Sequence, residues 1–220
     1  CTAHQLYRFH KQFDCLIIDE PDAYPYHSDL VLQGFAKQAC NGVQILLTAT
    51  PDESNRLMSR TEIQLFRRPH QYDLPLPRLR KYPLLIQVLW IHHYIRIEKR
   101  PTLIFVPSIQ LGKWLHLLLH IPFVYANHPQ LDPLIQQFKQ NEFTHLLTTT
   151  VLERGVTFDN VQVVVYEAQH KVFNKASLVQ IAGRVGRHFK YPTGDVNFLC
   201  SKKTRLLIEA IDHIKKANSA

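Results

Sequence analysis

The chain has 220 residues, of which 45% are hydrophobic and 20% charged, and this length allows one large domain or two small ones. These fractions are ordinary for a globular protein and exclude a disordered tail, a collagen-like fibre and a small disulfide-stapled domain. Lys and Arg number 26 against 18 Asp and Glu, so the net charge of +8 favours polyanionic partners such as nucleic acid or an anionic membrane surface.

Short apolar runs alternate along the chain with amphipathic stretches. We expect strands at 14–18, 43–48, 102–106, 123–126, 144–149, 161–166 and 195–199. We expect helices at 29–39, 84–97, 109–119, 132–140, 178–185 and 202–216. Most of the strand segments are apolar throughout, which is typical of strands buried on both faces. The alternation predicts an α/β fold with a mainly parallel sheet.

Residues 67–83 differ in composition from the rest of the chain, with four prolines and five Lys or Arg residues. Such a segment is stiff and cannot continue a helix, so we expect an interdomain linker there. Residues 84–220, after the linker, are numerous enough for a complete α/β domain. Residues 1–66 contain only two clear strands, which indicates the C-terminal part of a larger α/β domain that begins before Cys1.

The four cysteines, at positions 1, 15, 40 and 200, form no C-x-x-C pair, so neither a zinc ribbon nor a dithiol redox site is expected. Free cysteines without a secretory signal indicate a reducing, cytoplasmic setting. No apolar run reaches the roughly 18–20 residues that cross a bilayer, so direct membrane insertion is not expected.

Two carboxylates, Asp19 and Glu20, follow directly after the first predicted strand. Ligands bind α/β sheets at the carboxyl ends of strands, so this pair could serve a nucleotide. Asp19 would then hold Mg²⁺, and Glu20 would polarise the water that attacks the γ-phosphate. The alternative is an acidic turn without a catalytic role, which is common in α/β proteins.

Two hydroxyl side chains, Thr48 and Thr50, follow the next predicted strand. If the two strands are parallel neighbours, these threonines lie at the same edge of the sheet as the carboxylates and could form hydrogen bonds with them. The alternative is that Thr50 caps a helix that begins at Pro51.

A third segment, residues 148–158, begins with three threonines at the end of a predicted strand and contains Gly155. The strand would deliver hydroxyls at its end to a ligand, and the glycine would let the backbone approach a phosphate closely. The alternative is a hinge with an exposed pair of Glu153 and Arg154.

Residues 180–187 read Gln-Ile-Ala-Gly-Arg-Val-Gly-Arg. A helix over this segment would place Arg184 and Arg187 on one face, and the planar fork of arginine suits phosphate oxygens. Glycine inside a helix costs about 1 kcal/mol relative to Ala, and this chain has only 7 glycines. We therefore expect Gly183 and Gly186 to permit a close approach, although a solvated basic face is the alternative.

In this order, the segments Asp-Glu-Pro-Asp, Thr-Ala-Thr-Pro, Thr-Leu-Ile-Phe-Val-Pro-Ser, 148–158 and 180–187 resemble motifs II to VI of superfamily 2 helicases. The string DEPDAYPY is similar to the pattern of ComFA-type competence ATPases. Residues 148–158 resemble the same group and also PriA-like DNA helicases. Pro21 and Tyr24 depart from the ComFA pattern, which has a small aliphatic residue and Phe there.

The resemblance implies two RecA-like lobes, the first of them incomplete, that bind ATP and Mg²⁺ between them. Asp19 and Glu20 would act from the first lobe, while Arg184 and Arg187 would act from the second as arginine fingers. Further contacts with the nucleotide are implied for Thr48, Thr50, Gly155, Gln180 and Gly183. Contacts with single-stranded DNA are implied for Thr2, Ser108 and Thr149.

ComFA-type proteins are DNA-dependent ATPases that drive single-stranded DNA into competent Gram-positive bacteria, at the cytoplasmic face of the membrane. The resemblance therefore implies a translocase or helicase in DNA uptake, with a ComFC-like protein and the membrane DNA-uptake channel as further partners. The sequence contains no G-x-x-x-x-G-K-[ST] loop, so the phosphate-cradling lysine is missing. We expect the chain to be the C-terminal half or two-thirds of such an enzyme and to be inactive alone.

Other interpretations stay open. A PriA-like helicase, or another superfamily 2 DNA helicase in replication or repair, would share these motifs. An RNA helicase is disfavoured because motif VI lacks its His-Arg opening. A non-catalytic basic nucleic-acid-binding module would retain the motifs as relics. A metal-dependent nuclease that uses Asp19, Glu20 and Asp22 would leave both arginines without a role.

Overall fold

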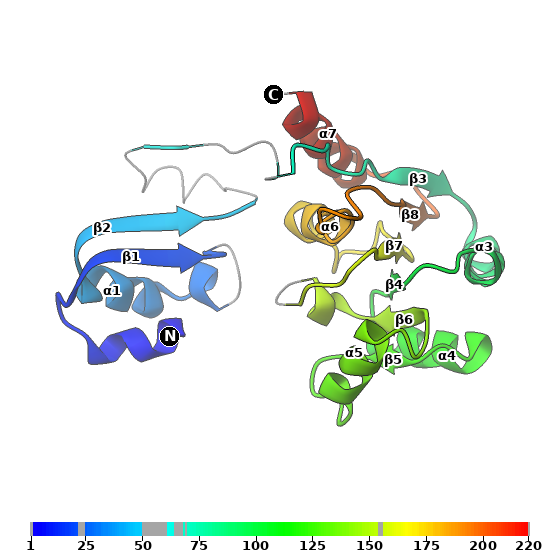
Figure 1. Ribbon diagram of the computed structural model, residues 1–220, viewed down its shortest axis with the longest axis horizontal. Helices are drawn as coiled ribbons and strands as arrows, with labels where there is room; N and C mark the ends of the chain where they lie inside the picture. The colour runs from blue at the N-terminus through cyan, green and yellow to red at the C-terminus, as the bar shows by residue number, and fades with distance from the viewer. Residues whose placement is uncertain are drawn as a thin grey trace. The chain divides into compact units, whose positions relative to one another are not determined.

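The computed structural model describes residues 2–21, 25–49, 61–63, 68, 70–153 and 156–219. The chain divides into two compact units, Cys1–Gln64 and Leu65–Ala220. Figure 1 labels the helices and strands of both. Each unit is considered by itself below.

The first unit is built around two parallel strands, β1 and β2. Its elements are η1 (Ala3–Arg8), β1 (Phe13–Asp19), η2 (Tyr26–Ser28), α1 (Leu30–Ala39) and β2 (Cys40–Leu47). Helix α1 begins after Asp29, whose side chain accepts hydrogen bonds from the backbone N–H groups of Val31 and Leu32, as expected of an N-cap residue. This connection through α1 brings the two strands side by side in parallel.

Only one face of this two-stranded sheet is covered by described residues. Ala36 and Ala39 of α1 are buried in a cluster with Leu6. On the strands, Ile17 and Val43 are 60% and 63% exposed. The prediction that the strands are buried on both faces is therefore wrong for β1 and β2 within the described part of the unit.

The second unit contains six parallel strands in the order β3-β8-β7-β4-β6-β5. They are β3 (Arg78–Lys81), β4 (Thr102–Phe105), β5 (Phe123–Val124), β6 (His145–Thr148), β7 (Gln162–Val165) and β8 (Val196–Cys200). All residues of β4, β7 and β8 are buried. The predicted α/β fold with a parallel sheet is thus confirmed, together with the apolar, doubly covered strands at its centre.

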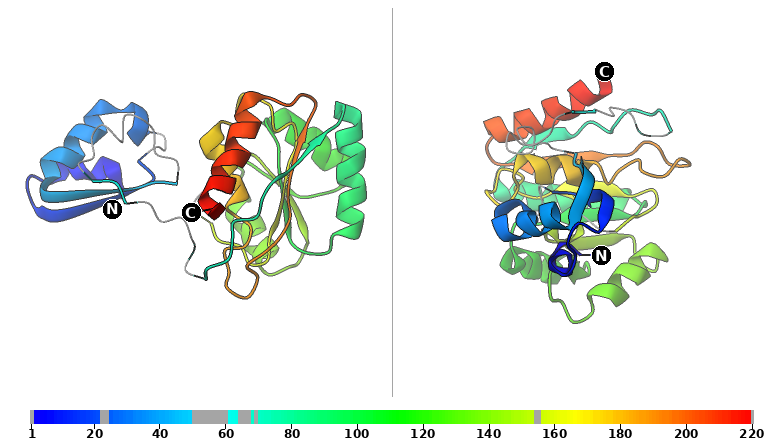
Figure 2. Two further views of the ribbon diagram at one scale, coloured as in Figure 1. Left: turned by 90° about the horizontal axis from the view of Figure 1, so that it is seen from above. Right: turned by 90° about the vertical axis from the view of Figure 1, so that its left-hand side faces the viewer.

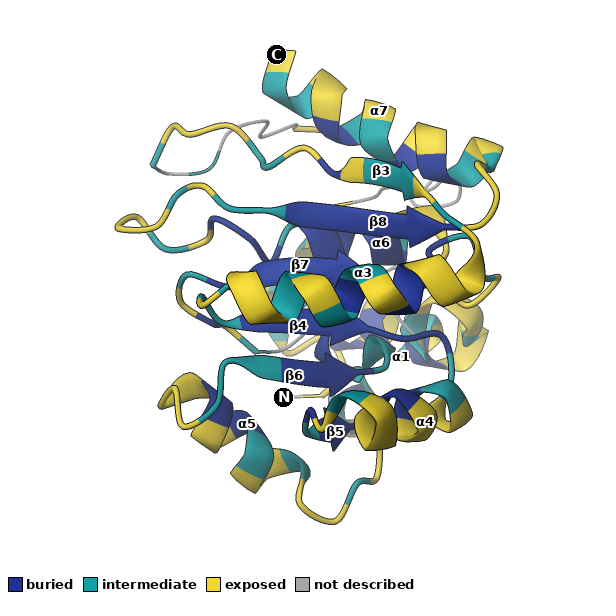
Figure 3. Cartoon of the chain, turned by 90° about the vertical axis from the view of Figure 1, so that its right-hand side faces the viewer, coloured by how far each residue is buried: buried dark blue, intermediate teal, exposed yellow. Residues whose placement is uncertain are grey.

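Helices cover both faces of the six-stranded sheet. They are α3 (Leu84–Ile97), α4 (Ile109–Leu119), α5 (Leu131–Lys139), α6 (Lys175–Ala182) and α7 (Arg205–Ser219), with a short η3 (Thr150–Leu152). One core joins α5, α6 and α7 to the sheet, and another core joins α3 and α4 to it. Figure 3 shows α3 and α4 in front of the strands, and Figure 2 shows α7 (red) and α3 (green) on opposite sides of them.

Strand β3 lies inside the segment 67–83 that its composition predicts to be a linker. It pairs with β8 through Arg78–Lys81, and Arg80 also donates a hydrogen bond to the side chain of Asn197, 2.9 Å away. Because β3 is at the edge of the sheet, the prolines that flank it remove no ladder hydrogen bond. A search for apolar runs does not find this strand, because three of its four residues are basic. The predicted domain boundaries stay a prediction.

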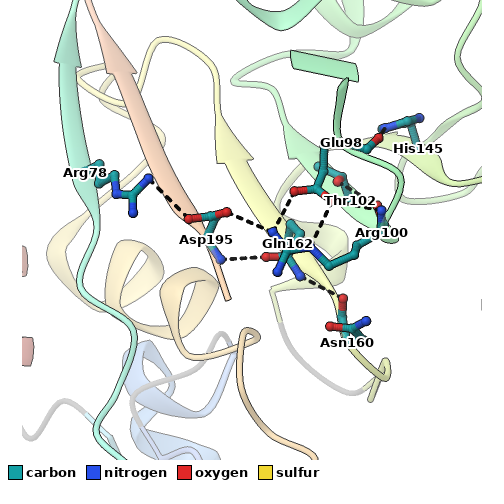
Figure 4. Close-up of polar contacts among 8 residues, drawn as sticks. All are labelled: Arg78, Glu98, Arg100, Thr102, His145, Asn160, Gln162 and Asp195. Carbon is teal, nitrogen blue, oxygen red and sulfur yellow. Dashed lines mark hydrogen bonds and ion pairs between the residues drawn. The ribbon is translucent and has the colours of Figure 1, made fainter. Parts of the chain in front are cut away.

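A polar network holds together the amino-terminal ends of β4, β7 and β8 (Figure 4). The guanidinium of Arg100 lies 2.6 Å from Glu98 and 2.9 Å from Asp195. Asp195 lies 3.4 Å from Arg78 on β3, and its backbone N–H donates to Gln162 at 2.6 Å. The hydrogen bond from Arg100 lowers the pKa of Glu98.

The Glu98→Gln substitution is expected to lower the free energy of unfolding by about 0.5–1.5 kcal/mol near neutral pH, because Arg100 loses an ionised partner. The folded-state pKa of Glu98 lies below its ordinary value of 4.5. The stabilisation is therefore complete above that value and is lost as the pH falls through the folded-state pKa. Urea denaturation at about pH 7 and about pH 3 measures this, and the difference from wild type should shrink at the lower pH. The exposed Glu142, replaced by Gln, is the control; an equal difference at both pH values would contradict the prediction.

Candidate nucleotide and nucleic-acid site

The two carboxylates predicted in the first unit and one of its predicted hydroxyls lie at one edge of its sheet. Asp19 is the last residue of β1 and pairs with Leu47. The backbone N–H of Glu20 donates to the carbonyl oxygen of Leu47 at 2.8 Å, and Thr48 follows directly. The structure therefore brings Asp19, Glu20 and Thr48 together, whereas Thr50 lies outside the described residues.

The backbone turns sharply at Glu20, whose φ is +54°. Few residues other than glycine adopt this left-handed conformation, although seven other described non-glycine residues share a positive φ. Among the described residues, no group of three or more His, Cys, Asp or Glu could hold a metal ion. Mg²⁺ commonly takes one or two protein carboxylates, with waters and substrate phosphates as its other ligands. A single carboxylate at Asp19 fits that mode of binding.

In the second unit, Ser108 and Thr149 follow neighbouring strands, because Phe105 of β4 pairs with Thr148 of β6. The hydroxyl of Ser108 accepts a hydrogen bond from the backbone N–H of Leu111 at 3.3 Å and caps α4. Thr2 belongs to the other unit, where it precedes η1. The structure thus brings two of the three predicted DNA contacts to one sheet edge. Gly155 lies outside the described residues.

The arginines of residues 180–187 do not share a helical face, so that prediction is wrong. Helix α6 ends at Ala182, with Gly183 as its C-cap. Gly186 has a φ of +70°, and a Cβ built there would lie 2.3 Å from the carbonyl oxygen of Pro192. A turn that needs glycine at this position therefore replaces the predicted end of the helix.

The two arginines have different environments. Arg184 is only 2% exposed. Its guanidinium donates to the backbone carbonyl oxygens of Glu153, at 3.2 Å, and of Val156. Arg187 is exposed, and its Nε donates to the carbonyl oxygen of Gly183 at 2.9 Å. Arg184 thereby ties the turn to the loop after β6, and Arg187 is the one that reaches the surface.

Gln180, the other residue predicted on this segment, is 7% exposed within α6. The hydroxyl of Ser177, one turn earlier, donates to the carboxylate of Glu153. The side chain of Ser177 in α6 and that of Arg184 in the turn after α6 therefore both bind the loop after β6.

Two residues that no motif identifies also hold the arginine-bearing turn. Arg68 donates from Nη1 to the carbonyl oxygen of Val185 and from Nη2 to that of Gly183, both at 2.7 Å. The Nε2 atom of His70 lies 3.0 Å from the carbonyl oxygen of Gly186. Burial, with a further contribution from the charge of Arg187, lowers the pKa of Arg68 to about 10. Single-sequence patterns give no signal for these contacts, because the partners lie more than a hundred residues apart.

The comparisons with known proteins agree with these motifs. The model of the helicase conserved C-terminal domain matches residues 80–189. The competence proteins ComFA of Bacillus subtilis (strain 168) and Streptococcus pneumoniae (strain R6) are each 36% identical over 99% of this chain, which covers 51% and 56% of their lengths. The chain thus spans about half the length of these curated relatives. The ATP-dependent DNA helicase RecG of Escherichia coli (strain K12) is 27% identical over 84% of the chain and 30% of its own length.

Solved structures of helicases share the fold. Saccharomyces cerevisiae Dbp5 bound to RNA and ADP BeF3 matches 95% of this chain and 58% of its own, with a TM-score of 0.68 and 17% identity. A DEAD box protein from Methanococcus jannaschii matches 99% of this chain and 62% of its own, with a TM-score of 0.53 and 18% identity. None of the described helices is long and apolar enough to span a membrane. Because the domain model matches half of its residues, the chain belongs to the superfamily 2 helicases that contain the helicase conserved C-terminal domain.

Proposed function

We propose that this chain forms part of an ATP-dependent translocase or helicase that moves single-stranded DNA during uptake in competent cells. The observation that carries the proposal is the 36% identity to two ComFA competence proteins over 99% of the chain. The intact enzyme would consist of this chain joined to a phosphate-cradling loop, which the sequence itself does not contain. A ComFC-like protein and the DNA-uptake channel are proposed as its partners.

The proposed mechanism divides the catalytic groups between the two units. Asp19 would hold Mg²⁺ and Glu20 would orient and polarise the attacking water. The exposed Arg187 would stabilise the charge that develops on the transferred phosphoryl group. Arg184, which is buried, would instead hold the loop after β6 against the turn. Hydrolysis would be coupled to movement because these groups belong to different units.

DNA would be held mainly through its backbone. Ser108 and Thr149, which follow neighbouring strands, are proposed as phosphate contacts, together with Thr2 in the first unit. Such contacts carry little sequence information, and their affinity falls as salt rises. The net charge of +8 supports a polyanionic partner.

ATP turnover tests the proposal. ATP turnover by the 220-residue chain alone should not exceed background, because the chain lacks the G-x-x-x-x-G-K-[ST] loop, whose backbone and lysine hold the phosphates. The intact enzyme should hydrolyse ATP in the presence of single-stranded DNA and should not need a fork. A helicase of replication or repair, to which the likeness to RecG gives some support, would instead unwind forked DNA efficiently. Turnover that single-stranded DNA leaves unchanged would contradict the proposal.

A further inference from the structure

Three rings gather on the segment that follows Arg187. The rings of His188 and Phe189 are stacked, with centroids 4.7 Å apart and an interplanar angle of 28°. The ring of Tyr191 lies 5.9 Å from that of His188. Phe189 is 66% exposed and Tyr191 is 44% exposed. The segment therefore presents aromatic faces to solvent rather than to the core of the second unit.

The ring of His70 lies beside the same turn and the ring of Tyr72 lies next to that of His70, although both come from a distant part of the sequence. His70 and Tyr72 have ring centroids 5.5 Å apart, and Tyr72 is 53% exposed. The Nε2 atom of His70 lies 3.0 Å from the carbonyl oxygen of Gly186. Together, His70, Tyr72, His188, Phe189 and Tyr191 form what is called here the ring cluster.

Backbone hydrogen bonds fix the local conformation of the cluster. The N–H of Tyr191 donates to the carbonyl oxygen of His188 at 2.9 Å, and the N–H of Lys190 donates to the imidazole of His188 at 3.2 Å. Arg68 holds the preceding turn through two carbonyl oxygens. A surface ordered in this way loses little conformational entropy when a ligand binds to it.

The segment that carries His188, Phe189 and Tyr191 is basic. The ammonium group of Lys190 lies 5.8 Å from the centroid of the Phe189 ring, and Arg187 precedes His188. Residues 183–191 contain no Asp or Glu, whereas Asp73 directly follows Tyr72. Exposed aromatic faces next to cations are the combination with which proteins bind single-stranded nucleic acid, because bases stack on the rings while cations neutralise phosphates.

We propose that the ring cluster is a stacking site for bases of single-stranded nucleic acid, with Phe189 and Tyr191 as its main contacts and Lys190 on the adjoining phosphate. The inference rests on the proposed function only in taking single-stranded DNA as the partner. It adds a base-binding surface to the phosphate contacts at the sheet edge. The ring cluster directly follows the turn that carries Arg187. The affinity of this site for a nucleic-acid strand would therefore depend on the position of Arg187.

The test compares two probes with the same number of phosphates: a fluorescein-labelled oligo(dT) of about 16 nucleotides, the upper range for one stacking module, and an abasic strand of equal length. Fluorescence anisotropy with the 220-residue chain, without ATP, gives both affinities. Wild type should bind oligo(dT) about five- to 150-fold more tightly, as expected for one stacked base. Phe189→Ala and Tyr191→Ala should each reduce that preference. Phe189→Leu, which keeps apolar bulk without an aromatic face, should reduce it as well.

Two variants separate stacking from charge. Lys190→Gln should weaken the binding of both probes equally and reduce the salt slope by about 0.7, the value for one phosphate on a single strand, while the preference for bases persists. Trp114→Ala is the matched control, because Trp114 is 48% exposed but belongs to α4, on the other face of the sheet. It should change neither quantity. Thermal unfolding confirms that each variant is folded.

Several outcomes would overturn the proposal. These are equal affinity of wild type for the two probes, a base preference that survives in Phe189→Leu, and a preference that excess ATP abolishes, which would assign the site to a mononucleotide. The failures of the two proposals are distinguishable. Missing DNA-stimulated hydrolysis in the intact enzyme, with the base preference intact, would count against the translocase alone. A missing base preference in an enzyme that DNA stimulates would count against the ring cluster alone.

Discussion

Replacing Arg187 by Ala in the intact enzyme should lower kcat for DNA-stimulated ATP hydrolysis by about 10³- to 10⁵-fold, the range for loss of an arginine finger. The side chain is exposed, and its Nε is anchored to the carbonyl oxygen of Gly183 at 2.9 Å. The role proposed for Arg187 is to stabilise charge in the transition state rather than the folded protein. KM for ATP should therefore change much less than kcat. Steady-state kinetics over a range of ATP concentrations measures both.

Neighbouring variants show whether the effect belongs to Arg187 itself. Arg187→Lys keeps the positive charge but loses the planar fork, so it should recover only part of the activity. Arg184→Ala should behave differently, because it leaves the carbonyl oxygens of Glu153 and Val156 without their buried donor, at a cost of about 1–3 kcal/mol in the free energy of unfolding. A Tm of Arg187→Ala that falls as far as that of Arg184→Ala would assign Arg187 a structural role instead.

The contrast between the two arginines shows which structural features sequence patterns cannot predict. The sequence predicts α3 and α4 at the observed residues, 84–97 and 109–119, because these largely apolar stretches are longer than a strand usually is. The prediction fails at the end of α6, which ends at Ala182, and the turn that follows needs glycine at position 186, where the backbone comes close to Pro192.

The same limit applies to the candidate site. Carboxylates after β1 and hydroxyls after β2 are predictable, because parallel neighbours bring their carboxyl ends to one edge. The contacts of Arg68 with the turn at Gly183 and Val185 are not predictable. Their acceptors are backbone carbonyl oxygens, which every residue type has. Strand β3 is missed for a related reason, since its edge position allows basic residues where a central strand would need apolar ones.

Replacing Glu20 by Gln in the intact enzyme should lower kcat about 10²- to 10⁴-fold, the usual contribution of a general base, while ATP still binds. The amide keeps the size of the carboxylate but cannot take up a proton from the attacking water. Its backbone neighbours should stay in place, because the N–H of Glu20 is bound to Leu47 at 2.8 Å. Binding of a fluorescent ATP analogue and steady-state turnover, measured on the same preparation, separate the two effects.

The Glu20→Gln variant also decides between a motor and a non-catalytic module. A motor needs turnover, so in competent cells the variant should reduce the frequency of transformation along with kcat, even though it is expressed and binds DNA. A basic module with relic motifs would retain its function in the same cells. Asp14→Asn is the matched control, because Asp14 is an exposed carboxylate at the other end of β1, away from the edge that carries Glu20. If both variants transform as well as wild type, the carboxylate at Glu20 has no part in the work of this protein and DNA binding alone must explain it.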